Sequence, residues 1–281
     1  MHGIATSADG TRLAYQRCGE SGPTLVIVTG AIQHRAVDPT LAELAHALSD
    51  RLSVVVYDRR GRGDSGDVKP YAVEREIDDI AALLALRDGE SFLFGHSSGA
   101  VLAIEAARAG LPVARLAVYE PPLDTAESAA ADPAGADYLR RLEAHLAAGR
   151  NDDALAQFMV EGVGMPPEAV EHMKSTPVWS QLASAAPSLP YDHAVMDSLS
   201  SGPTLAEGRW ASATQPTLVL SGDASMAFMT EAADLAARSL PNARRLTLAG
   251  QGHGAAALAL EPVLRDWFVG VGVDVGAGRL R

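Results

Sequence analysis

The sequence predicts an α/β fold in which helices flank a mainly parallel sheet and a helical cap is inserted into the chain. Short apolar runs alternate with helix-like segments in both halves of the chain, as expected for parallel strands joined by right-handed crossovers. A glycine-flanked stretch, residues 95–99, connects one of these runs directly to a helix. The strand signal disappears over residues 124–212, which indicates a helical insertion.

Composition limits the classes of function that this chain supports. With 281 residues, 47% of them hydrophobic, it is long enough to bury a full core. A net charge of −12 argues against partners such as nucleic acid or an anionic membrane. Cys18 is the only cysteine, which excludes an internal disulfide. There is no signal-peptide pattern, and no apolar run reaches the roughly 18 residues needed to span a bilayer. We expect a cytoplasmic protein that acts on a small-molecule substrate. The sequence does not decide whether the protein forms a homodimer.

The first elements are predicted from turn residues and apolar runs. Asp9-Gly10 is a tight-turn dipeptide, so the chain is expected to open with a β-hairpin. The charged, glycine-rich loop 58–66 follows a buried strand and is predicted to lie at the surface. Further strands are expected at 24–29, 52–57 and 115–119, with helices that begin near Pro39 and around Ile77.

The second half consists of the predicted cap and the return to the sheet. We divide the chain into a core, residues 1–123 and 213–281, and a cap, residues 124–212. Asp132-Pro133 is a candidate helix start and Gly149 a helix stop. Short cap helices are expected at 151–160, 167–173 and 178–185, followed by strands at 217–220 and 245–248 and helices at 230–240 and 255–268.

The stretch Gly95-His96-Ser97-Ser98-Gly99 has the pattern G-x-S-x-G between a strand and a helix. So tight a turn forces its middle residue into a strained conformation and leaves no room for a Cβ at the flanking glycines. Ser97 Oγ is thereby raised above the sheet edge. The first N–H groups of the helix also face that point, where they favour a developing negative charge.

Four stretches, in this order along the chain, resemble the α/β-hydrolase superfamily: 29–31, 58–65, 95–99 and 250–253. The resemblance implies that Ser97 is the nucleophile and that His253, in a Gly-rich loop before the last helix, is the general base. It also implies that the backbone N–H groups of Ala31 and Ser98 form the oxyanion hole. Stretch 58–65 is largely structural in such enzymes, so no chemistry is assigned to it. His96 is expected to have a structural role.

The position of the catalytic acid departs from the family pattern. In most members it follows the strand seen here at 217–220, three residues after a glycine, and that position is Ser225. Glu120 ends the strand that follows the Ser97 helix, where some members, including certain haloalkane dehalogenases, carry their acid. We therefore predict Glu120 as the acid and keep Asp223 as the alternative.

Together these residues predict a cofactor-independent serine hydrolase that cleaves a small, hydrophobic ester, thioester or lactone through an acyl-enzyme on Ser97. The scattered histidines predict no metal site. Two alternatives stay open at this point: non-hydrolytic chemistry such as cyclisation or decarboxylation on the same scaffold, and a ligand-binding, receptor-like protein with little turnover. The candidate substrate contacts are His34, Ile32, Trp179, Met226 and Phe228.

Overall fold

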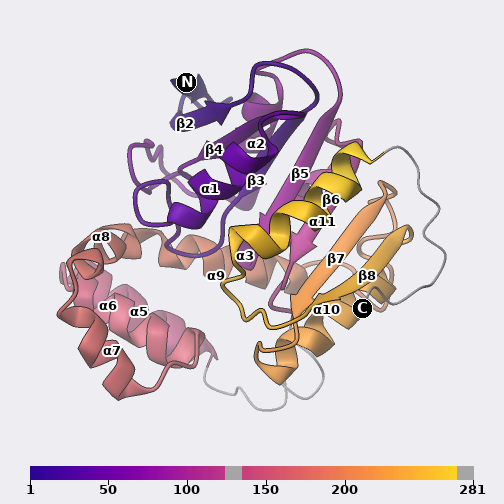
Figure 1. The fold of residues 1–281 in the computed structure, drawn as a ribbon. Coiled ribbons are helices and arrows are strands. Elements are labelled where there is room, and N and C mark those ends of the chain that lie inside the picture. The colour runs from indigo at the N-terminus through magenta and orange to yellow at the C-terminus, as the bar shows by residue number, and fades with distance from the viewer. Residues whose placement is uncertain (124–134, 271–281) are drawn as a thin grey trace.

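A computed structural model describes residues 1–123 and 135–270, and within them a mixed sheet lies at the centre of the molecule (Figure 1). Its eight strands have the order β1-β2-β4-β3-β5-β6-β7-β8. They are β1 (His2–Thr6), β2 (Arg12–Cys18), β3 (Thr24–Val28), β4 (Ser53–Tyr57), β5 (Ser91–His96), β6 (Arg115–Tyr119), β7 (Thr217–Gly222) and β8 (Ala243–Leu248). Only the β1–β2 and β2–β4 pairs are antiparallel among these strands, which confirms the mainly parallel sheet.

The N-terminal hairpin forms at the predicted turn. Gly10 has a φ of +85°, and its N–H donates to the carbonyl of Ser7 at 2.9 Å. Only glycine adopts such a φ readily, so the turn residue fixes the β1–β2 register in which Thr6 pairs with Arg12.

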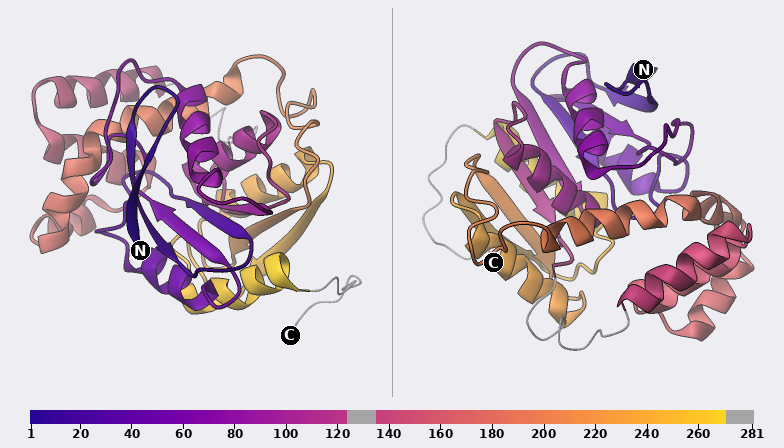
Figure 2. Two further views of the ribbon diagram at one scale, coloured as in Figure 1. Left: turned by 90° about the horizontal axis from the view of Figure 1, so that it is seen from above. Right: turned by 180° about the vertical axis from the view of Figure 1, so that it is seen from behind.

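Helices cover both faces of the sheet (Figure 2), and each face has its own cluster of buried apolar side chains. One face carries α1 (Pro39–Leu48) and α11 (Ala257–Val269). The other carries α2 (Val73–Leu84), α3 (Ser98–Arg108) and α10 (Ala227–Ser239). Helix α3 is buried along almost its whole length, since its small residues pack closely against the strands. This packing holds the start of α3 firmly at the carboxyl edge of the parallel strands.

The insertion between β6 and β7 is helical, as predicted. Its elements are α5 (Gly135–Ala147), α6 (Asn151–Gln157), a π-helical turn (Phe158–Gly162), α7 (Pro167–Lys174), α8 (Pro177–Ala185) and α9 (Leu189–Asp197). Gly149 follows α5 with a φ of +69°, as a helix stop requires. The candidate start at Asp132-Pro133 lies outside the described residues. No helix of the described ranges is both long and apolar enough to cross a membrane.

Helix α9 was not predicted, and its position explains why. It runs from the cap across the back of the core against α3 (Figure 2). Its residues Asp192 and Val195 are both buried, the first in ion pairs and the second in the core on the α3 side. A helix that buries a carboxylate lacks the apolar stripe by which amphipathic helices are found in a sequence.

The prediction that loop 58–66 lies at the surface is correct for Gly63 and Asp64, which are exposed, and wrong for its other charged residues. Asp58, Arg59, Arg60 and Arg62 are each at most 2% exposed. The three arginines pair with buried carboxylates from distant parts of the chain. Asp58 instead pairs with Arg35. Burial of charged groups in a protein requires such pairing, and a local stretch of sequence does not reveal those partners.

Candidate active site

Ser97 lies at a sharp turn between β5 and α3. Its φ of 55° and ψ of −128° are strained for a residue with a side chain. A Cβ on Gly95 would come within 2.6 Å of the α3 backbone, and one on Gly99 would collide with the carbonyl oxygens of Val28 and Thr29. The two glycines therefore let β5, α3 and the end of β3 approach closely enough to hold Ser97 in this conformation.

The Gly99→Ala variant is expected to lose about 1–3 kcal/mol or more of stability, because its Cβ overlaps β3 backbone that cannot move without breaking the sheet. Gly254→Ala is the matched control, since that glycine has open space around it and lies in the loop of His253. Thermal unfolding of both variants measures the difference. Equal melting temperatures would contradict the packing described here.

Three side chains from distant segments form a hydrogen-bonded chain at this turn. His253 Nε2 lies 3.1 Å from Ser97 Oγ, and His253 Nδ1 lies 2.7 Å from Glu120 Oε2. Glu120 follows β6, with a φ of 47°, and its side chain is fully buried. The imidazole is partly open to solvent, with 27% of its side chain exposed. The order serine, histidine, carboxylate is the arrangement in which an imidazole activates a hydroxyl.

The environment of Glu120 keeps it ionised. Burial alone would raise the pKa of Glu120, but hydrogen bonds from His253, the Gly222 N–H and the Ser225 hydroxyl hold it below its usual value. Gly222 N donates to Oε1 at 2.9 Å and Ser225 Oγ to Oε2 at 2.8 Å. A carboxylate at Nδ1 requires the proton on that nitrogen, which leaves Nε2 free to accept the proton of Ser97.

Asp223 has a different partner. It is exposed, and its Oδ1 accepts from the backbone N–H of Gly250 at 2.6 Å. It thus supports the loop that carries His253, while Glu120 is the carboxylate that contacts the imidazole. Ser225, at the position where the resemblance places an acid, instead donates to Glu120.

The loop after β3, residues 30–38, lies against Ser97. A Cβ on Gly30 would be 2.8 Å from Ser97 Cβ, so only glycine lets this loop come so close. Ala31 follows directly, and Ile32 after it has a positive φ of 56°. Ser98 is the first residue of α3, where N–H groups have no partner within the helix. The oxyanion-hole roles of Ala31 and Ser98 stay predictions.

Comparison with known proteins identifies the group to which this arrangement belongs. The model of the alpha/beta hydrolase family matches residues 25–265. The chain belongs to the α/β-hydrolase family. This confirms the resemblance seen in the sequence. A solved α/β hydrolase from Sphaerobacter thermophilus is 47% identical, covers 95% of this chain and all (100%) of its own, and superposes with a TM-score of 0.85.

Curated relatives match over a smaller part of this α/β hydrolase. N-formylmaleamate deformylase from Pseudomonas putida is 38% identical over 121 residues, which is 42% of this chain and 44% of that protein. Proline iminopeptidase PfmaB from Pestalotiopsis fici is 31% identical over 98 residues, or 34% of this chain and 35% of that protein. The chain thus aligns with less than half of the length of either curated relative.

Two further side chains of this α/β hydrolase connect its active-site loops. Gln33 accepts from Gly30 N–H at 2.8 Å and donates to Asp38 at 2.7 Å, which fixes its amide orientation. His96 Nδ1 lies 2.8 Å from Gln33 Oε1, and Nε2 lies 2.9 Å from the carbonyl of His253. Burial lowers the pKa of His96 to about 3, so the ring is neutral and its single N–H serves one acceptor at a time. The structural role expected for His96 thus includes support of the His253 loop, whereas nothing in the sequence pointed to Gln33.

The candidate substrate contacts are dispersed in the structure. Ile32 and Trp179 belong to the apolar cluster of the cap. His34 is buried, and neither of its ring nitrogens has a hydrogen-bond partner among the described residues. Met226 is half-buried before α10, and Phe228 is 37% exposed. Contact between these five residues and a substrate stays a prediction.

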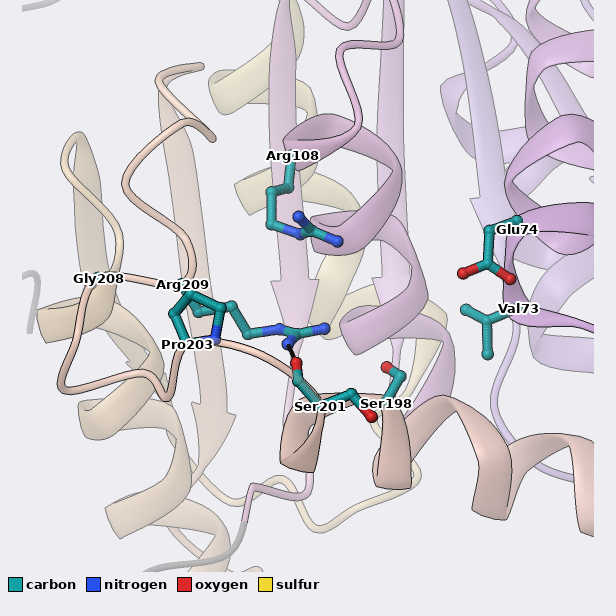
Figure 3. Close-up of a pocket in the computed structure, with 8 residues that line it drawn as sticks. All are labelled: Val73, Glu74, Arg108, Ser198, Ser201, Pro203, Gly208 and Arg209. Carbon is teal, nitrogen blue, oxygen red and sulfur yellow. Dashed lines mark hydrogen bonds between the residues drawn. The ribbon is translucent and has the colours of Figure 1, made fainter.

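A surface cavity of about 340 Å³ lies away from Ser97 (Figure 3). It is lined by Val73, Glu74, Arg108, Ser198, Ser201, Pro203, Gly208 and Arg209. Arg108 ends α3, so the cavity is at the opposite end of that helix from Ser97. Within residues 1–123 and 135–270, no three histidine, cysteine, aspartate or glutamate side chains are grouped so as to hold a metal ion.

Proposed function

We propose that this α/β hydrolase cleaves a small, hydrophobic ester, thioester or lactone through an acyl-enzyme on Ser97. The observation that carries the proposal is the continuous chain from Ser97 Oγ through His253 to buried Glu120, at 3.1 and 2.7 Å. Such a chain supplies a nucleophile, a base and a group that holds the base in the required tautomer.

The roles of the residues follow from these positions. His253 Nε2 takes the proton of Ser97 as Oγ attacks the carbonyl carbon, and it then donates that proton to the leaving oxygen or sulfur. Glu120 stabilises the imidazolium while it exists. The N–H groups of Ala31 and Ser98 bind the oxyanion. A water molecule, deprotonated by His253, then attacks the acyl-enzyme and releases the acid and free Ser97.

The apolar side chains of the cap are an argument for a substrate with a hydrophobic acyl group. Its apolar cluster includes buried Met159, Trp179 and Leu189 and continues into Ala31 and Ile32 of the loop beside Ser97. An apolar surface that reaches the nucleophile favours alkyl or aryl groups over charged ones. The partly aligned relative, which is named as a deformylase, also supports hydrolysis at a carbonyl carbon.

Labelling with a fluorophosphonate tests the proposal. Intact mass should show one adduct on the wild type and none on Ser97→Ala, because only an activated serine reacts. A panel of p-nitrophenyl esters, thioesters and lactones of increasing chain length then defines the substrate class, with medium apolar acyl chains expected to react fastest. A wild type that stays unlabelled where a control esterase is labelled would refute the proposal. A labelled Ser97 without turnover of any panel member would favour non-hydrolytic chemistry.

A further inference from the structure

Loop 58–66 contacts the candidate active site through one buried arginine. Arg62 is 2% exposed, and each nitrogen of its guanidinium donates to a different group. Nη1 donates to the carbonyl of Gly30 at 2.5 Å, Nη2 to Asp192 at 2.5 Å and Nε to the Ser188 hydroxyl at 2.9 Å. The planar guanidinium is thus held in one orientation.

The carbonyl that Arg62 binds belongs to the peptide that bears the proposed oxyanion donor. The C=O of Gly30 and the N–H of Ala31 lie in one rigid plane and point in opposite directions. A guanidinium fixed on the oxygen therefore also fixes the direction of the N–H. Its positive charge draws electron density toward the oxygen and makes the N–H a stronger donor, because hydrogen bonds in series polarise one another.

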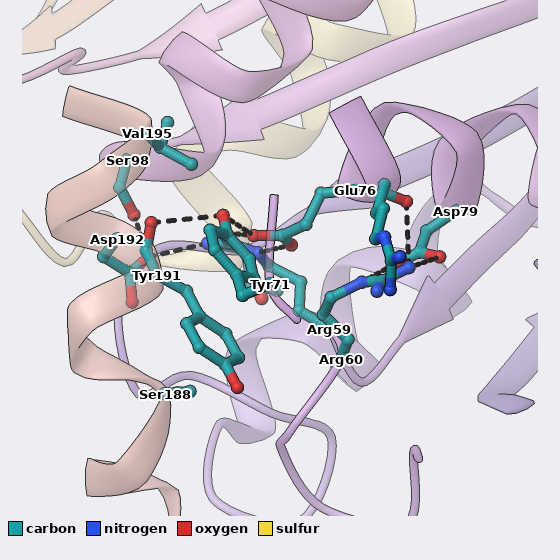
Figure 4. Close-up of polar contacts among 12 residues, drawn as sticks. Arg59, Arg60, Tyr71, Glu76, Asp79, Ser98, Ser188, Tyr191, Asp192 and Val195 are labelled. Atoms are coloured by element: carbon teal, nitrogen blue, oxygen red, sulfur yellow. Dashed lines mark hydrogen bonds and ion pairs between the residues drawn. The ribbon is translucent and has the colours of Figure 1, made fainter. Parts of the chain in front are cut away.

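Asp192 of cap helix α9 connects this arginine to the second donor residue. Its Oδ1 accepts from the Ser98 hydroxyl at 2.7 Å and from Arg59 Nη1 at 2.7 Å (Figure 4). Its Oδ2 accepts from Arg62. Burial alone raises the pKa of Asp192, but the charges of Arg62 and Arg59 hold it below its usual value. One ionised carboxylate of the cap thus contacts Ser98 directly and the Gly30–Ala31 peptide through Arg62.

We propose that Arg62 and Asp192 are positioning residues for the oxyanion hole. Arg62 orients and polarises the Ala31 N–H, and Asp192 fixes Arg62 and Ser98 from the cap. The inference rests on the hydrolysis proposed above. It makes the cap a structural part of the catalytic site in addition to a cover over it.

Loop 58–66 offers a matched control for a purely structural role. Arg60 is fully buried, like Arg62, and also pairs with carboxylates (Figure 4). Its hydrogen bonds go to Asp79 at 2.7 and 2.8 Å, to Asp9 at 2.9 Å and to the Arg75 carbonyl at 3.0 Å. None of these partners lies in the loop after β3. Loss of Arg60 thus removes a buried ion pair of similar kind and leaves the Gly30–Ala31 peptide untouched.

The test compares Arg62→Lys with Arg60→Lys in the full chain. For each folded variant, p-nitrophenyl butyrate gives kcat and KM, and a pentyl trifluoromethyl ketone gives an inhibition constant. Such a ketone adds to a serine hydroxyl as an anionic hemiketal and so reports on the oxyanion hole. We expect Arg62→Lys to lower kcat about 10- to 100-fold and to weaken ketone inhibition by the same factor, with KM within about twofold, since removal of a whole donor costs about 10²–10³ in kcat. Arg60→Lys should change only the melting temperature.

Three outcomes would overturn the inference or its basis. If Arg62→Lys and Arg60→Lys have equal kcat and equal ketone inhibition, the inference about Arg62 is refuted. Turnover of the ester by the wild-type protein would then still support the proposed function. A wild type without turnover or ketone inhibition would overturn both. If Arg62→Lys does not fold, Ser98→Ala replaces it, because that change removes only the hydroxyl bonded to Asp192. It should lower kcat and ketone affinity together, and wild-type values for both would refute the proposal.

Discussion

Replacement of Ser97 by alanine is expected to lower the turnover of p-nitrophenyl butyrate by about 10⁵–10⁶-fold, the loss typical of a serine–histidine unit that has lost one member. His253→Ala should cost nearly the same, because an unactivated serine hydroxyl is a weak nucleophile at neutral pH. The double variant should be no slower than either single one, because each change alone already disables the pair. Steady-state kinetics of the three variants measures this lack of additivity.

His46→Ala is the control for loss of a histidine. It is exposed near the end of α1, a helix that carries none of the three side chains of the Ser97–His253–Glu120 chain, and should keep wild-type turnover. Effects of Ser97→Ala and His253→Ala that multiply in the double variant would mean that the two side chains act independently, against the 3.1 Å contact between them.

Glu120→Gln is expected to lower kcat by about 10⁴-fold while the fold is kept, because an amide no longer selects the required imidazole tautomer or stabilises its charged form. Asp223→Asn should change kcat by less than about tenfold, since that side chain accepts a backbone hydrogen bond and does not contact the imidazole. Kinetics at saturating ester, with circular dichroism to verify the fold, separates the two carboxylates.

Moving the carboxylate from position 120 to position 225 gives a sharper control for the role of Glu120. Ser225 Oγ lies 2.8 Å from Glu120 Oε2, the oxygen that contacts His253. Adding Ser225→Asp to Glu120→Gln places a carboxylate close to the same imidazole nitrogen, and part of the lost turnover should return. If Asp223→Asn instead proves as damaging as Glu120→Gln, the acid is not Glu120.

Local patterns predicted the elements and the residues that meet at Ser97. The spacing of glycines identified the turn around Ser97, because backbone segments that pack this closely leave room only for glycine. The unusual position of Glu120 followed from the failure of the family pattern at Ser225, and the structure places this carboxylate against His253. Both inferences depend only on knowing where strands end, and the apolar runs in the sequence show this well.

Burial of charge could not be predicted in the same way. Loop 58–66 looks polar and exposed as a string of residues, yet Arg59 pairs with Asp192, which lies 133 positions further along the chain. Whether a charged side chain lies inside depends on partners that only the folded chain brings near. The same limit applies to Gln33, whose contacts with Gly30 and His96 join two loops that are remote in sequence.

The anchoring of α9 also bears on how substrate enters and product leaves. To lift this helix from the core would separate Asp192 from Arg59 and Arg62 and leave buried charges without partners. Loss of one partner in such a pair costs about 3–5 kcal/mol, so fewer than about one molecule in a hundred would be open at that end. Any opening of the cap is therefore expected to involve the helices α5 to α8, while α9 stays packed against the core. Exchange rates of amide hydrogens should accordingly be slow in α9 and faster in α7.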